Sequence, residues 1–108
     1  MADPEEERIG RVSFELKQEA SVERVLVKIR HHLGRDWLTL SSEDIAALGW
    51  LLGHVWTHVG FMTWEKMGLD TVTLPDVNRL VEIARDMQAG KVAEPDGLKR
   101  AREILGSL

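Results

Sequence analysis

The chain has 108 residues, no cysteine and a formal net charge of −4, with 44% hydrophobic and 30% charged residues. This composition is ordinary for one globular domain and excludes disulfides and cysteine nucleophiles, while the negative charge disfavours bulk affinity for nucleic acid. Acidic residues follow the first methionine, where a signal peptide would have basic and apolar regions, so we expect a cytoplasmic protein.

The N-terminal part of the chain contains two different patterns. Residues 1–10 are rich in acidic side chains and are expected to form a flexible arm ahead of a single helical domain over residues 11–108. In residues 11–17 (RVSFELK) apolar and polar side chains alternate, which is typical of a half-buried strand. A lone strand needs a partner for its backbone groups, so this strand would pair within the chain or with a second copy.

The next segment, residues 21–33, fits two structures. As a helix capped by Ser21 and ended by Gly34, it would be amphipathic. Its apolar face would then consist of Val22, Val25, Leu26, Ile29 and Leu33. As a strand, its β-branched residues alternate, and it would join a small sheet with residues 11–17 and 37–40. The five helical positions and the two end signals favour the helix, so we predict a mainly helical fold with at most a short N-terminal strand or ribbon.

The most apolar part of the chain covers residues 45–64 and contains no Asp, Glu, Lys or Arg. Ser41 and Asp44 ahead of it have the spacing of a capping box, and Gly68 suits the end of a helix. We therefore predict a long central helix over about residues 42–67, around which the domain is built. A membrane span of this length is disfavoured because the segment contains two histidines and two threonines and has acidic flanks.

At about 100° per residue, three faces separate on this predicted helix. The aliphatic face contains Ile45, Leu48, Leu52, Val55, Val59 and Met62. A helix-packing groove contains Gly49, Gly53 and Gly60. The aromatic and histidine face contains Trp50, His54, His58 and Phe61. One short chain can hardly cover all three faces, so we expect a partner protein or a second copy on the aromatic and histidine face.

Two more helices are predicted after the central one. Thr73 and Asp76 form a second capping-box pattern, and Gly90 marks the end of that helix. Its buried face would contain Val77, Leu80, Val81, Ala84 and Met87. A short last helix over residues 98–105 would present Leu98, Ala101 and Leu105 to the core.

No residue pattern in the sequence is typical of a catalytic site, and we expect neither an enzyme nor a cofactor. His54 and His58 have the i, i+4 spacing that can chelate a divalent metal. However, the glutamate of a zincin helix is missing, and Glu65 lies about 10 Å further along the helix axis than His58. We therefore expect no metal, and we assign the two histidines to an interface.

A basic stripe of four residues lies opposite the apolar face of residues 21–33. It consists of Arg24, Lys28, His31 and Arg35, which could contact nucleic-acid phosphates or another anion.

The order of RVSFELK, SVERVLVKIRHHLG and a Ser-capped helix resembles the ribbon-helix-helix repressors over about residues 11–55. The resemblance implies a dimer whose paired strands enter the DNA major groove, with Arg11, Ser13 and Glu15 facing the bases. Residues 35–40 are an insertion relative to the compact turn of that family.

The function that the sequence favours is a non-enzymatic protein-interaction module, either a homo-oligomer or a small subunit of a larger assembly. The aromatic and histidine face would bind the partner. The alternative is a nucleic-acid-binding regulator that uses either an N-terminal ribbon or the basic stripe.

Overall fold

The computed structural model describes residues 4–59 and 72–106, and the side chains of these residues from Leu16 onward. Within these ranges the chain forms helices and no strand. The elements are α1 (Pro4–Leu33), the 3-10 helix η1 (Gly34–Thr39), α2 (Ser42–His58), α4 (Leu74–Gln88) and α5 (Glu94–Ile104). The predicted mainly helical fold is therefore confirmed.

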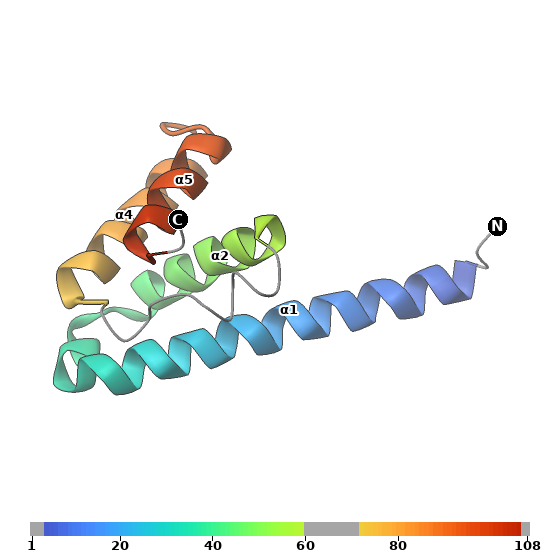
Figure 1. Ribbon diagram of the computed structural model, residues 1–108, viewed down its shortest axis with the longest axis horizontal. Coiled ribbons are helices and arrows are strands. Elements are labelled where there is room, and N and C mark those ends of the chain that lie inside the picture. Colours follow the sequence, from blue (N-terminus) through green and yellow to red (C-terminus); the bar gives the residue numbers. More distant parts are fainter. Residues whose placement is uncertain (1–3, 60–71, 107–108) are drawn as a thin grey trace.

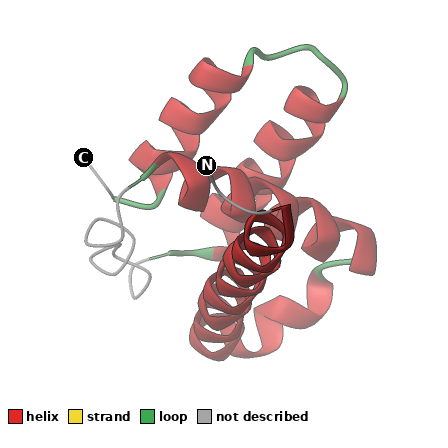
Figure 2. Ribbon diagram, turned by 90° about the vertical axis from the view of Figure 1, so that its right-hand side faces the viewer, coloured by secondary structure: helices red, strands yellow, loops and turns green. Residues whose placement is uncertain are grey.

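Helix α2 lies between α1 on one side and the α4–α5 pair on the other (Figure 1). It runs antiparallel to α1, and the N-terminal part of α1 extends beyond the other helices. Figure 2 looks nearly along α1 and shows α4 and α5 as two adjacent helices joined by a loop. Among the described residues, no helix has the length and apolar character needed to cross a membrane.

Helix α1 corrects the strand predicted at its N-terminal end. Residues 11–17 belong to this helix, as do residues 4–10 of the predicted arm and residues 21–33. A helix satisfies its backbone groups internally, whereas a short strand at this place would need a partner strand. Glu, Leu, Lys, Gln and Ala in this part of the chain are also good helix formers. The strand on which the ribbon-helix-helix resemblance depends is thus a helix here.

The predicted apolar face of residues 21–33 packs on the rest of the protein. Val25 and Ile29 are buried, while Val22, Leu26 and Leu33 are partly buried against the same core. Helix α1 ends at Gly34, which has a positive φ of 58° that a glycine adopts at little cost. Residues 34–39 then form η1, where Trp37 is buried, in place of a turn leading to a strand.

The start of α2 is the predicted capping box. The Asp44 backbone N–H donates to Ser41 Oγ at 3.1 Å, and the Ser41 backbone N–H donates to Asp44 Oδ2 at 3.2 Å. The other carboxylate oxygen of Asp44 forms an ion pair with Arg85 of α4. One carboxylate therefore both caps α2 and ties it to α4.

Helix α2 ends nine residues before the predicted boundary at residue 67. Its last residue is His58, and Val59 has an extended backbone with φ −108° and ψ 151°. The β-branched Thr57 and Val59 and the following Gly60 are weak helix formers, which favours an end at this place. Residues 60–71, which include Phe61, Met62 and the predicted stop at Gly68, lie outside the described residues.

Helix α4 begins at the second predicted capping box. The Thr73 backbone N–H donates to Asp76 Oδ2 at 3.0 Å, and the Asp76 backbone N–H donates to Thr73 Oγ1 at 3.3 Å. The backbone hydrogen bond from Thr73 favours the ionised carboxylate and lowers the pKa of Asp76. After the helix, Gly90 has a positive φ of 74°, as expected for its predicted role as a stop.

One apolar core joins the helices. Helix α2 contributes Ala47, Leu48, Leu51, Leu52 and Val55; α4 contributes Val77, Leu80, Val81, Ile83 and Ala84; α5 contributes Leu98 and Ala101, followed by Leu105. Most of the predicted buried positions are confirmed, although Ile45, Val59 and Met87 are only partly buried. Leu51 is fully buried, so the apolar face of α2 is broader than the predicted stripe.

Candidate functional site

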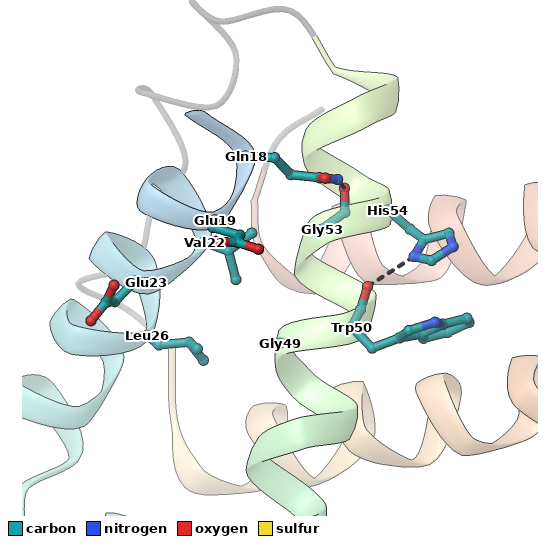
Figure 3. Close-up of a pocket in the computed structure, with 9 residues that line it drawn as sticks. All are labelled: Gln18, Glu19, Val22, Glu23, Leu26, Gly49, Trp50, Gly53 and His54. Carbon is teal, nitrogen blue, oxygen red and sulfur yellow. Dashed lines mark hydrogen bonds between the residues drawn. The ribbon is translucent and has the colours of Figure 1, made fainter. Parts of the chain in front are cut away.

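An open groove of about 390 Å³ lies between α1 and α2 (Figure 3). It is lined by Gln18, Glu19, Val22, Glu23 and Leu26 of α1 and by Gly49, Trp50, Gly53 and His54 of α2. This volume lies in the range of known ligand pockets, which are mostly apolar with a few polar groups. The groove is therefore the candidate functional site.

Gly49 and Gly53, which lie one helical turn apart and have no side chains, line the α2 side of the groove. A Cβ atom at Gly49 would lie 3.7 Å from Leu26 Cδ1, and one at Gly53 would lie 3.5 Å from Gln18 Nε2. Both are ordinary van der Waals distances, so α1 passes these glycines in contact and without a clash. Gly60, the third glycine predicted for helix packing, lies outside the described residues.

Gln18 ties α1 to α2 beside the groove. Its side-chain Nε2 donates to the Gly53 carbonyl oxygen at 2.9 Å and to Thr57 Oγ1 at 3.1 Å. The Thr57 hydroxyl in turn donates to the Gly53 carbonyl oxygen at 2.9 Å. Both hydrogens of the Gln18 amide are therefore used, and its Oε1 atom remains as an acceptor.

Trp50 and His54 lie at the α2 edge of the groove with their rings pointing away from α1 (Figure 3), and both are half-buried. Their ring centroids are 4.2 Å apart, with an angle of 41° between the ring planes. His54 Nδ1 lies 2.9 Å from the Trp50 carbonyl oxygen. Since a carbonyl oxygen only accepts, Nδ1 is the donor in this hydrogen bond. This bond fixes the imidazole next to the indole.

The other two residues of the predicted aromatic and histidine face are placed differently. His58 Nε2 lies 3.3 Å from Glu94 Oε1 of α5, and both side chains are about half exposed. Phe61 lies outside the described residues. Trp50 and His54 thus line the groove, whereas His58 belongs to the contact between α2 and α5. Within residues 16–59 and 72–106, whose side chains the structure describes, no three His, Asp or Glu side chains are grouped so that they could hold a metal.

The predicted basic stripe is exposed along the C-terminal half of α1 and into η1. It consists of Arg24, Lys28, His31 and Arg35. Arg11 and Ser13 lie on the backbone of α1 and not on a strand, and their side chains are outside the described part of the chain.

Sequence reasoning missed the α1 wall of the groove. Gln18 and Glu19 precede Ser21, where the sequence predicted the helix to begin, and no role was predicted for Glu23. The signal was present in the spacing: Gln18 continues the series Val22, Val25 and Ile29 one turn toward the N-terminus. Extending that helix by one turn would have placed the glutamine against α2.

Comparison with models of protein families gave no match, and comparisons with curated proteins and with solved structures gave no significant match either.

Proposed function

We propose that the protein is a non-enzymatic interaction module that binds another protein chain through the groove between α1 and α2. The observation that carries this proposal is the half-buried Trp50, which lies beside His54 at the edge of an open, mainly apolar groove. Aromatic residues in such positions are frequent hot spots of protein interfaces. The bound chain is a partner in a larger assembly or a second copy of this protein.

A crosslinking experiment tests the proposal. A photoreactive phenylalanine derivative replaces His54 in one sample and Arg79, which is exposed on α4, in a control sample. We expect a defined adduct from the first position only. An adduct of twice the chain mass identifies self-association, and any other single mass identifies a partner. Equal adducts from both positions, or none from either, would contradict the proposal.

Light scattering gives an independent measurement of self-association. If the adduct is a dimer, the wild-type mass should rise with concentration and Trp50→Ala should weaken the association by about 2 kcal/mol. The unfolding free energy of Trp50→Ala must be measured beside it, because a half-buried tryptophan also contributes to folding. Loss of association with an unchanged fold supports the groove, and unchanged association contradicts its use by a second copy.

The second candidate function is nucleic-acid binding through the basic stripe. The observation in its favour is that all four stripe residues are exposed on one continuous stretch of chain. Binding to phosphates would fall steeply as salt is raised. The substitution Lys28→Glu should abolish a gel shift of duplex DNA at low salt, whereas Lys99→Glu on α5 should leave it unchanged. No shift with the wild type at low salt rules this candidate out.

A further inference from the structure

The polar groups that line the groove are mainly hydrogen-bond acceptors. The α1 wall carries the carboxylates of Glu19 and Glu23, which are both exposed. Gln18 uses both of its N–H donors in hydrogen bonds to α2, and Nδ1 of His54 is bonded to the Trp50 carbonyl oxygen. The indole N–H of Trp50 is the donor among the lining side chains, and none of the described lining residues is Lys or Arg.

These polar groups determine which kind of ligand the groove can bind. A ligand with a carboxylate or phosphate would face two glutamates of the same sign. A ligand with an ammonium or guanidinium group would supply the missing donors and the opposite charge.

The shape of the surface points to a helix as the ligand. The groove is open and follows two antiparallel helices that pack side by side. Leu16, one turn before Glu19 on α1, is 60% exposed and extends the apolar surface toward the projecting end of that helix. Long open grooves with apolar walls are typical receptors for one face of an amphipathic helix.

We infer that the groove between α1 and α2 binds an amphipathic helix of a partner protein, with lysine or arginine residues bordering its apolar face. The apolar side chains of that helix pack against Val22 and Leu26, which are partly buried, and its cationic side chains meet Glu19 and Glu23. The inference rests on the proposed function and adds to it the charge and shape of the partner.

Two synthetic peptides test the inference with the full-length protein. The basic peptide is helical, with leucines at i, i+3, i+4 and i+7 and lysines at the borders of that face. The acidic peptide has the same leucines, with glutamate in place of every lysine. Fluorescence anisotropy of each labelled peptide measures its Kd at low and at high salt. We expect the basic peptide to bind more tightly, with an affinity that falls as salt is added.

Two matched pairs of Glu→Gln substitutions test which glutamates bind the basic peptide. The pair Glu19→Gln and Glu23→Gln should weaken binding of the basic peptide by about fivefold or more, because two partly exposed ion pairs are lost. The pair Glu82→Gln and Glu103→Gln changes the net charge equally on α4 and α5 and should leave the Kd unchanged. Circular dichroism of each variant checks that the fold is retained. Equal weakening by both pairs would overturn the inference, because only overall charge would then matter.

The remaining outcomes separate this inference from the proposed function. If both peptides bind equally and Trp50→Ala weakens both, the groove is a protein-binding site without selectivity for cations, and only the inference fails. If Trp50→Ala changes neither affinity, both fail. If octylammonium binds and the basic peptide does not, the groove takes a small organic cation, and the helix is ruled out as its occupant.

Discussion

Alanine in place of Gly49 is expected to stabilise the fold, whereas alanine in place of Gly97 is expected to destabilise it. A Cβ atom at Gly49 would make ordinary contact with Leu26 Cδ1 at 3.7 Å. The substitution would therefore gain about 0.5–1 kcal/mol, because glycine is a poor helix former. At Gly97, near the start of α5, the gain in helix propensity is at most a part of this amount.

The cost at Gly97 comes from Met87 on α4. A Cβ atom there would lie 2.7 Å from Met87 Cγ and closer still to Met87 Sδ, so the methionine would have to move. Overpacking of this kind costs about 1–3 kcal/mol, and the gain in helix propensity offsets less than about 1 kcal/mol of it. The net loss in the free energy of unfolding should be about 1–2 kcal/mol.

Urea denaturation followed by far-UV circular dichroism measures both changes as shifts of the midpoint at constant slope. A cycle with Met87→Ala isolates the clash: in that background Gly97→Ala should cost at least about 1 kcal/mol less. If its cost is the same in both backgrounds, the close approach of α4 and α5 at this glycine is refuted. If Gly49→Ala destabilises as strongly as Gly97→Ala, α1 and α2 lie closer than the structure places them.

Three further measurements probe the core, a helix cap and the fold class. Leu48→Ala should lower the free energy of unfolding by about 2–5 kcal/mol, since Leu48 is fully buried, whereas Leu38→Ala at a 79% exposed position should change it by less than about 0.5 kcal/mol; equal costs would place Leu48 outside the core. Thr73→Ala should cost about 1 kcal/mol near neutral pH. The pKa of Asp76 is lowered in the folded state, so this stabilisation is present above its unfolded pKa and is lost as the pH falls through the folded value. Urea denaturation from neutral to acidic pH should therefore show a difference between Thr73→Ala and wild type that shrinks with acid, and a constant difference would contradict the role of the carboxylate. Far-UV circular dichroism of the wild type should show a mainly helical spectrum, and a sheet-dominated spectrum would contradict the fold.

The elements that could be predicted from the sequence are those with local signals. Ser41 with Asp44 and Thr73 with Asp76 mark the starts of α2 and α4, because a capping box depends on residues only three positions apart. The apolar faces of α4 and α5 also follow from helical spacing, since each of these helices buries one side. Local hydrogen bonds and a single buried face can be predicted without knowing which helix packs against that face.

The N-terminal helix and the end of α2 depend on less local effects. Over seven residues the alternation in RVSFELK fits a strand, but the backbone groups there had no partner strand, and the longer helix satisfies them internally. The C-cap of α2 is Val59, which is extended and carries no glycine signal, so the sequence pointed to the strong stop signal at Gly68.

The candidate groove was only half predictable for a related reason. Trp50 and His54 stand out because large polar and aromatic groups in an apolar helix are conspicuous. Glu19 and Glu23 are indistinguishable from solvated surface residues until α1 is placed beside α2. A groove between two helices is a property of their packing, and the residue spacing within either helix alone does not contain it.

Helix α2 packs against α1, α4 and α5. A cut between Val59 and Val72 would therefore divide one apolar core between two fragments. The first would expose Leu48, Leu52 and Val55 of α2, and the second the matching faces of α4 and α5. Neither fragment can bury its leucines alone, because in the whole chain the apolar face of each fragment packs against that of the other. We therefore expect the two fragments, made as separate chains, to associate through these apolar faces.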